Sequence, residues 1–325
     1  MNALGHPVST PPSVAIAPAP RESRVSVVIP CHDEVATVGA VVTGFRQSLP
    51  QAEIIVVDNA SSDGTAQAAL EAGARVVYES RLGKGFALLT GFAEAGDSDY
   101  CVMVDGDDTY PAADASALVQ TAIDRGVDVV IGTRLDSSQP GAFRRGHSLG
   151  NRLFAWLVRM LFGIHTRDLF SGYRVLSRRF LDITPLIATR FDVEAELSVQ
   201  AKVNGFRVIE VPVEYRPRGE RSESKLRTFR DGYHILLAIT VLFRDYRPMT
   251  FFGALGLFFA IASLASGYVP VKEYLQTGLV NHLPRAVLAA GLFILSALAL
   301  AIGVLLSSIN RRSVEIAALI RKVSR

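Results

Sequence analysis

Three aspartates follow one apolar run of the sequence, and their spacing suits a divalent cation. Residues 100–104 (Tyr-Cys-Val-Met-Val) predict a buried strand, and Asp105, Asp107 and Asp108 come directly after it. Ligands of open α/β sheets bind at the carboxyl ends of the strands. Two carboxylates spaced i, i+2 at such an end can reach one cation, and Gly106 between them leaves room for its approach. Mg²⁺ and Mn²⁺ prefer oxygen ligands and often bind one or two carboxylates together with substrate phosphates.

The same aspartates also fit a purely structural role. An acidic turn could instead cap the helix that the sequence predicts from about Asp114. Because short motifs often occur by chance, the Asp-x-Asp pattern alone favours the structural role. The rest of the chain reverses that choice.

The elements that would position these aspartates predict an α/β fold. Strands alternate with helices, which is typical of βαβ units and of a mostly parallel sheet. Polar clusters follow the first two predicted strands, at 30–34 and 58–65, where a nucleotide crevice would lie. Asx turns and a helix cap are the structural alternative for the second cluster. The predicted strands are 24–29, 53–57, 74–77, 100–104, 127–131 and 208–215.

Two common nucleotide-binding motifs do not occur where they would be expected. Gly83-Lys84-Gly85 opens a predicted helix, but it lacks the spacing and the Ser or Thr of a Walker A loop. The first strand is not followed by Gly-x-Gly-x-x-Gly, which argues against a dinucleotide enzyme.

The composition excludes several classes of protein. A formal net charge of +3 over 325 residues is too balanced for a nucleic-acid partner. The two cysteines, Cys31 and Cys101, fall in or beside predicted core strands, so we interpret them as packing residues of a reducing compartment. The six histidines show no ligand spacing, which argues against a zinc site.

Two long uncharged segments near the C-terminal end predict a membrane anchor. They lie at about 250–269 and 286–309, and each exceeds the roughly 18 apolar residues that suggest a spanning helix. Arg244 and Arg247 precede the first segment and five basic residues follow the second, whereas the connecting loop has few. By the positive-inside rule both ends are cytoplasmic. We therefore expect a multi-pass protein of the cytoplasmic membrane whose catalytic domain faces the cytoplasm.

These segments divide the chain into three parts. Residues 1–22 are rich in Pro, Ala and Ser, lack the features of a signal peptide and predict a disordered tail. Residues 23–228 would form the α/β domain, and residues 229–325 an interfacial helix and the two spans. Residues 151–164 also have the apolar surface, Trp and Arg of a membrane-interface helix, with a buried core helix as the alternative.

The chain resembles glycosyltransferase family 2, in its polyprenyl-phosphate branch of dolichol-phosphate mannose synthases and bacterial undecaprenyl-phosphate glycosyltransferases. The resemblance extends from about Arg24 to Arg247. It implies a GT-A fold that binds a UDP- or GDP-linked sugar and a polyprenyl phosphate, and it leaves open a homo-oligomer. The matching segments, in order, are VVIPCHDE, VVDNASSDGT, GKG, DGDD, GTR, 144–151, DLFSGYRV and SESKL.

The resemblance also implies roles for individual residues. Asp105 and Asp107 would hold Mg²⁺ or Mn²⁺ on the donor diphosphate and so act in catalysis. Many members have Gln two places after the second Asp, where this chain has Thr109, so water would replace the third protein ligand. The nucleotide pocket would comprise Pro30, His32, Glu34, Asp58, Gly83 and Lys84.

The chemistry of the acceptor can be argued from general principles. A divalent cation stabilises the departing diphosphate as a Lewis acid. A hydroxyl acceptor needs a general base, whereas a lipid monophosphate is already ionised and needs cationic groups that hold it beside the anomeric carbon. Asp168 and Ser171-Gly172 would shape the floor of that site, unless they form an ordinary turn. The positions that match the family's acceptor site are Arg134, Arg144, Ser148, Arg218 and Lys225, with Arg216 and Arg221 as alternatives to Arg218.

The sequence thus predicts an inverting hexosyltransferase that acts by direct displacement. A processive or lipid-acceptor family 2 enzyme is the first alternative, although such members usually carry a Gln-x-x-Arg-Trp segment and the one tryptophan here is Trp156. A non-catalytic membrane scaffold with a nucleotide-sugar fold is the alternative of another class. The acidic cluster and the basic acceptor set argue against it.

Overall fold

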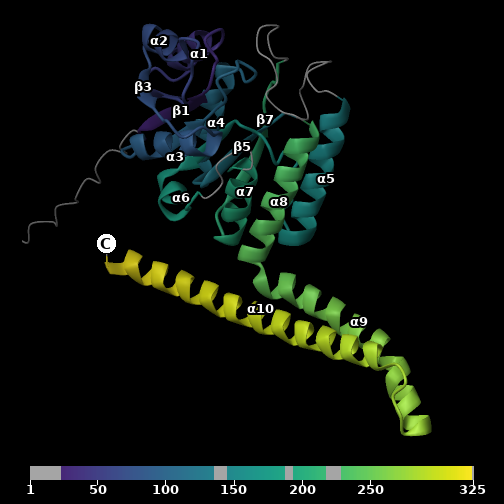
Figure 1. Ribbon diagram of the computed structural model, residues 1–325. Helices are drawn as coiled ribbons and strands as arrows, with labels where there is room; N and C mark the ends of the chain where they lie inside the picture. Colours follow the sequence, from purple (N-terminus) through teal and green to yellow (C-terminus); the bar gives the residue numbers. More distant parts are fainter. Residues whose placement is uncertain (1–22, 135–144, 187–192, 217–227, 324–325) are drawn as a thin grey trace, which may run out of the picture.

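An α/β body and two long C-terminal helices make up the computed structural model of the chain (Figure 1), which describes residues 23–134, 145–186, 193–216 and 228–323. Within these residues the body contains one seven-stranded sheet of order β3-β2-β1-β4-β6-β5-β7. The strands are β1 (Val25–Cys31), β2 (Glu53–Asp58), β3 (Arg75–Tyr78), β4 (Tyr100–Met103), β5 (Val129–Thr133), β6 (Arg174–Ser177) and β7 (Val208–Pro212).

The sheet is mostly parallel, as the sequence predicted. β1 pairs in parallel with β2 and β4, and β5 pairs in parallel with β7. The exception is β6, which lies between β4 and β5 and runs antiparallel to both. Because β1, β2 and β4 point the same way, their carboxyl ends meet at one edge of the sheet, and Asp105 follows the last of them.

Helices cover both faces of the sheet. Alternate residues of β1 explain this, because Val27 and Ile29 pack on one face and Val28 on the other. The first face carries α1 (Val38–Ser48), α2 (Thr65–Glu71), a short 3₁₀ turn η1 (Ala112–Asp114) and α4 (Ala115–Arg125). The second carries α3 (Lys84–Glu94), α6 (Arg178–Ile183) and α7 (Val193–Val203).

Close packing of α3 on the sheet depends on one glycine. A Cβ at Gly91 would stand 3.0 Å from Val57 Cγ2 and closer still to Val28. The glycine therefore lets α3 approach β1 and β2 directly, which sets the position of Lys84 at the beginning of that helix.

A third apolar cluster packs α8 (Thr228–Tyr246) against the body. It forms where α5 (Arg145–Phe162), α7 and α8 meet, and it includes Val158, Phe162 and Ile239. The outward face of α5 exposes Trp156 and Met160, so this helix is partly core and partly surface. One face of the helix is therefore buried as a core helix would be, and contact of the exposed face with a membrane stays a prediction.

The C-terminal part consists of α9 (Pro248–Thr277) and α10 (Leu283–Val323), which lie side by side in Figure 1. Both are long and apolar enough to cross a membrane, by length and composition alone. They contact through small residues: Ser296 donates to the Gly256 carbonyl and Ser263 to that of Ala289, each at 2.8 Å. The predicted spans fall within these helices, which extend further at both ends.

Candidate active site at the strand ends

Lys84, Asp105 and Glu194 meet at the carboxyl edge of the sheet. The Lys84 Nζ lies 2.5 Å from Asp105 Oδ1 and also contacts Glu194 Oε1. Lys84 begins α3, Asp105 follows β4 and Glu194 lies at the beginning of α7, so the fold brings together three distant segments. Burial lowers the pKa of Lys84, but the two carboxylates outweigh that effect and raise the pKa above its ordinary value.

Asp107 is held in a fixed orientation. Its side chain is buried, and its Oδ1 accepts hydrogen bonds from Thr109 N at 3.2 Å and Thr109 Oγ1 at 2.6 Å. Asp108 between them takes a left-handed conformation with φ of 57°, which turns the chain sharply there. Thr109, the residue that departs from the family pattern, thus orients the Asp107 carboxylate by hydrogen bonds in this structure.

Asp105 packs against the backbone of Gly172. A Cβ at Gly172 would overlap the Asp105 carboxylate, and the Gly172 N–H donates to Tyr110 Oη at 3.0 Å. Gly172 was predicted for the floor of the acceptor site, and this contact places it beside Asp105; its role towards an acceptor stays a prediction. The glycine leaves the space that the carboxylate occupies.

The donor set fits a hard divalent cation. Asp105 offers a partly exposed carboxylate that already attracts a positive charge, the ammonium of Lys84. Asp107 offers a second carboxylate two residues away. Among the described residues, no group of three His, Cys, Asp or Glu side chains is arranged as metal ligands. Two carboxylates with phosphate and water would suit Mg²⁺ or Mn²⁺.

Four of the six residues predicted for the nucleotide lie along the ends of β1 and β2, and Gly83 and Lys84 lie at the beginning of α3. Cys31 and Asp58 are paired in register, so Pro30, His32 and Glu34 stand beside the end of β2. His32 Nδ1 lies 2.8 Å from the Asn59 carbonyl oxygen, and Asp58 Oδ1 accepts from Ser61 N at 3.2 Å. The Glu34 N–H donates to Thr65 Oγ1 at 2.8 Å. The structure therefore brings these side chains to one edge.

Asn59 ties the loop before α3 to this edge, and the sequence reasoning missed it. Its Nδ2 donates to the carbonyls of Glu79 and Arg81, at 3.1 and 2.7 Å, and its Oδ1 accepts from Gly83 N at 2.7 Å. The buried amide thus fixes the approach to Lys84. An amide two residues after the predicted strand 53–57 was the available signal.

Glu194 was also missed, although it contacts Lys84. It lies in a helix whose residues from Val193 to Ala201 are all buried, including Glu196 and Gln200. A carboxylate at the beginning of such a buried helical segment is unusual, because buried charges require partners. That signal depends on knowing the burial, which the sequence alone does not give.

Of the residues predicted for the acceptor phosphate, Arg134 is described in full. Its guanidinium donates to both oxygens of Asp168, at 2.7 and 2.6 Å, and its backbone N–H adds a third bond at 3.1 Å. Asp168 is fully buried and so positions Arg134 rather than meeting a ligand itself. Ser148 lies in α5, but its side chain is not described. Arg144, Arg218 and Lys225 lie outside the described residues.

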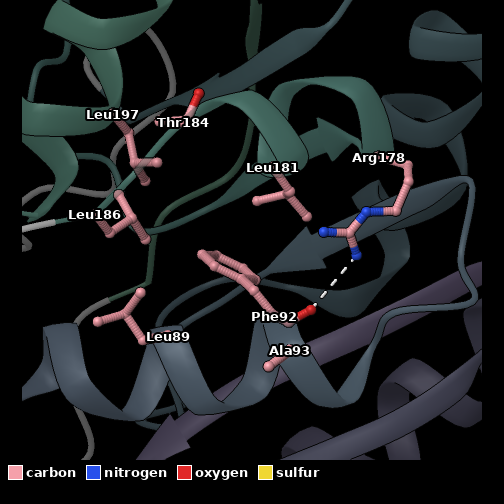
Figure 2. A pocket seen from close by; sticks show the side chains of 8 residues that line it. All are labelled: Leu89, Phe92, Ala93, Arg178, Leu181, Thr184, Leu186 and Leu197. Atoms are coloured by element: carbon pink, nitrogen blue, oxygen red, sulfur yellow. Dashed lines mark hydrogen bonds between the residues drawn. The ribbon is translucent and has the colours of Figure 1, made fainter. Parts of the chain in front are cut away.

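A separate apolar pocket of about 180 Å³ lies between α3 and the segments around α6 and α7 (Figure 2). Its lining includes Leu89, Phe92 and Leu197, and Arg178 at one side donates to the Phe92 carbonyl at 3.5 Å. None of the predicted site residues lines this pocket, so it is distinct from the carboxylate site.

Comparison with known proteins identifies the family. The model for glycosyl transferase family 2 matches residues 26–183. Glycosyltransferase AglJ of Haloferax volcanii is 32% identical over 274 residues, which cover 84% of this chain and 89% of that protein. Polyprenol monophosphomannose synthase of Mycolicibacterium smegmatis is 30% identical over 211 residues, which cover 60% of this chain and 78% of that protein.

A solved structure shares the fold. Glucosyl-3-phosphoglycerate synthase from Mycobacterium tuberculosis, in complex with Mn²⁺, uridine diphosphate and phosphoglyceric acid, matches with a TM-score of 0.57 over 68% of this chain and 79% of that chain. At 23% identity this likeness concerns the fold, which is GT-A. The chain therefore belongs to glycosyl transferase family 2, as its motifs predicted, and is a hexosyltransferase.

Proposed function

We propose that the protein transfers a hexose from a UDP- or GDP-sugar to a polyprenyl phosphate at the cytoplasmic face of the membrane. The observation that carries this proposal is the combination, in one family 2 chain, of the Asp105 and Asp107 site with two helices long and apolar enough to span a membrane. The similarity to a polyprenol monophosphomannose synthase supports it.

Asp105 and Asp107 would hold Mg²⁺ or Mn²⁺ against the donor diphosphate. When bound, the cation supplies Lewis acidity to the departing diphosphate. Thr109 supports this role because its hydroxyl fixes the orientation of Asp107. The nucleotide itself would lie along the ends of β1 and β2, beside Asp58, His32 and Glu34, with Pro30, Gly83 and Lys84 completing the pocket.

The lipid phosphate would need to be held, not deprotonated. A phosphate monoester is largely ionised near neutral pH, so its oxygen can attack the anomeric carbon without a general base. The bond from the anomeric carbon to the diphosphate breaks as the new one forms, its electron pair leaves with the diphosphate, and the configuration inverts. The proposed phosphate ligands are Arg134, Arg144, Ser148, Arg218 and Lys225.

Asp168 would prepare Arg134 for this task. The pairing of one guanidinium edge, Nε and Nη2, with a buried carboxylate removes most of the freedom of the arginine side chain before the lipid arrives. The ring of Tyr215 lies 5.4 Å from the same guanidinium and adds a second constraint.

The lipid acceptor would reach the enzyme by diffusion within the membrane. We propose that α9 and α10 span it, that both chain ends and the domain at 23–228 are cytoplasmic, and that α5 rests on the lipid surface through Trp156 and Met160. The exposure of these two side chains and the neighbouring Arg159 support this orientation.

The test is a transfer assay with the purified full chain in detergent. A panel of labelled UDP- and GDP-sugars is offered with undecaprenyl phosphate. We expect a single labelled sugar on the lipid, only with a divalent cation present. A growing polymer would favour the processive alternative, and neither transfer nor hydrolysis would favour a non-catalytic scaffold.

A further inference from the structure

Lys84 lies between two acidic side chains that come from distant parts of the chain. Its ammonium stands 2.5 Å from Asp105 Oδ1 and also contacts Glu194 Oε1. Only 11% of the Lys84 side chain is exposed, compared with 28% of the Asp105 side chain. The ammonium is therefore enclosed within the proposed metal site and is not a surface charge attracted to its rim.

The Asp105 carboxylate cannot bind a divalent cation and keep its close contact with the Lys84 ammonium unchanged. Two cations on one carboxylate repel each other, and the repulsion is strong where little water screens it. Lys84 already contacts one of the two oxygens that a metal would use. Entry of Mg²⁺ or Mn²⁺ must therefore weaken or break the contact between Lys84 and Asp105.

Glu194 offers the displaced ammonium another partner. Its side chain is 4% exposed, and its Oε2 is buried without a hydrogen-bond partner in the described part of the chain. A buried carboxylate oxygen without a donor is unfavourable, and an ammonium has three N–H donors. Glu194 can thus hold Lys84 after Asp105 has taken another cation.

A phosphate is the ligand that suits this end of α3. Lys84 is the first residue of an 11-residue helix, whose amino end carries partial positive charge and favours anions. Gly83 before it has φ of 147°, in a region that favours glycine, so the chain turns sharply there. A diphosphate bound with the metal would meet both the helix end and the ammonium.

We propose that Lys84 occupies the cation position on Asp105 while no donor is bound, and that it moves to the donor diphosphate when the divalent cation enters. Glu194 is the positioning residue that holds the ammonium in both states. The inference rests on the metal site of the proposed function. It adds that metal and nucleotide promote each other's binding, because the metal displaces Lys84 and the diphosphate accepts it.

The test is Mn²⁺ binding to the full chain in detergent, followed by the electron paramagnetic resonance of free Mn²⁺, with and without UDP or GDP. Without nucleotide, Lys84→Met should bind Mn²⁺ about tenfold more tightly than the wild type, within the range of ordinary coupling energies. The nucleotide should then improve Mn²⁺ binding less than it does in the wild type. Lys84→Arg, which keeps the charge, should behave as the wild type does.

Controls separate local from general electrostatics. Lys202→Met removes an exposed charge from α7 and should leave Mn²⁺ binding unchanged. Glu194→Gln alone should weaken the coupling between Mn²⁺ and nucleotide binding. Added to Lys84→Met, the same change should have little further effect, because Glu194 acts through Lys84. Lys84→Gln repeats the test with a side chain that can still bond Glu194, and the Tm of each variant verifies folding.

Two results would overturn the inference, and they differ. If the wild type binds Mn²⁺ and both Lys84→Met and Lys84→Gln bind it no more tightly without nucleotide, Lys84 does not compete for the site, and the proposed function stands. If the wild type binds no Mn²⁺ with either nucleotide, the metal site fails and the proposed function fails with it.

Discussion

Asp105 and Asp107 differ in their surroundings although only one residue separates them. The Asp105 side chain is partly exposed and paired with Lys84, whereas Asp107 is buried and oriented by Thr109. A cation at this edge would bind the accessible carboxylate of Asp105 and the Asp107 carboxylate, whose orientation is fixed. Such preorganisation is what electrostatic stabilisation of a transition state requires.

Loss of either carboxylate should therefore reduce sugar transfer severely. We expect Asp105→Ala and Asp107→Ala each to lower the initial rate of labelled transfer by roughly 10²- to 10³-fold, as removal of a key transition-state group does. EDTA should abolish transfer, and Mg²⁺ or Mn²⁺ should restore it. Asp108→Asn is the control, since Asn tolerates the left-handed conformation at this exposed position. Full activity in EDTA would disprove the metal site.

The acceptor residues give the second prediction at this scale. Arg144→Ala and Lys225→Ala should each weaken the use of polyprenyl phosphate by roughly ten- to a hundredfold, because a charge-assisted contact contributes about 1.5–3 kcal/mol. Nucleotide affinity, measured by calorimetry, should stay near the wild-type value. Arg144→Lys should rescue only in part because the planar fork is lost. Reduced nucleotide affinity with unchanged acceptor dependence would instead assign these residues to the donor.

Among the elements, the loop between β3 and α3 contains Glu79, a carboxylate whose contribution to stability should depend on pH. Glu79 accepts from Arg81 Nη2 at 2.7 Å and from Thr90 Oγ1 at 2.6 Å. Hydrogen bonds from Arg81, then from Thr90, lower the pKa of Glu79 to about 2 from an ordinary 4.5. The charged form is thus favoured by folding, so its contribution is complete above about pH 4.5 and is lost as the pH falls towards 2.

Glu79→Gln should consequently show its effect only when the wild-type carboxylate is ionised. At pH 6 the variant should have a lower free energy of unfolding than the wild type, and the difference should shrink as the pH falls from about 4.5 to 2. Denaturant titrations across this range measure it. A difference that stays constant with pH would contradict the role given to the charge.

The pocket of Figure 2 contains a hydroxyl, Thr184 Oγ1, that is buried without a hydrogen-bond partner among the residues that the structure describes. Replacement by Val keeps the shape and removes a group that lost its water on folding, so Thr184→Val should raise the free energy of unfolding by about 1 kcal/mol. Thr90→Val is the matched control and should lower it, because the Thr90 hydroxyl donates to Glu79. The Tm of both variants in detergent tests the pair, and destabilisation by both would contradict this reading.

The sequence predicted most elements of the sheet but not β6. The strands with continuous apolar runs, such as β1 and β2, were identified to within two residues at each end. β6 has four residues and includes Arg174, whose guanidinium is fully buried and donates to two backbone carbonyls and to Ser198 Oγ. Local pattern cannot identify such a strand, because its partners come from tertiary structure.

The candidate site was predicted where its signal was local. Asp105, Asp107 and Asp58 stand directly after apolar runs, so their common edge followed from the parallel sheet. Glu194 could not be found in this way, since its contact with Lys84 joins residues 110 positions apart. The pairing of Arg134 with Asp168 was missed for the same reason.

In the whole molecule, α8 leads from the catalytic body directly to the helical hairpin, with Arg247 between α8 and α9 (Figure 1). A soluble phosphate acceptor would not require two such helices, whereas the proposed lipid acceptor would explain why body and hairpin occur in one chain. The central claim is therefore that the enzyme joins the anomeric carbon of a hexose to the phosphate of a lipid.

The most direct test is the composition of the products formed from nucleotide-sugar and undecaprenyl phosphate. Mass spectrometry should find a lipid with one hexose and one phosphate, and one nucleoside diphosphate should be released for each lipid formed. The sugar should have the anomeric configuration opposite to that of the donor. Undecaprenol, which lacks the phosphate, should accept nothing. Sugar on undecaprenol, release of nucleoside monophosphate with a lipid diphosphate, or free hexose alone would contradict the proposal.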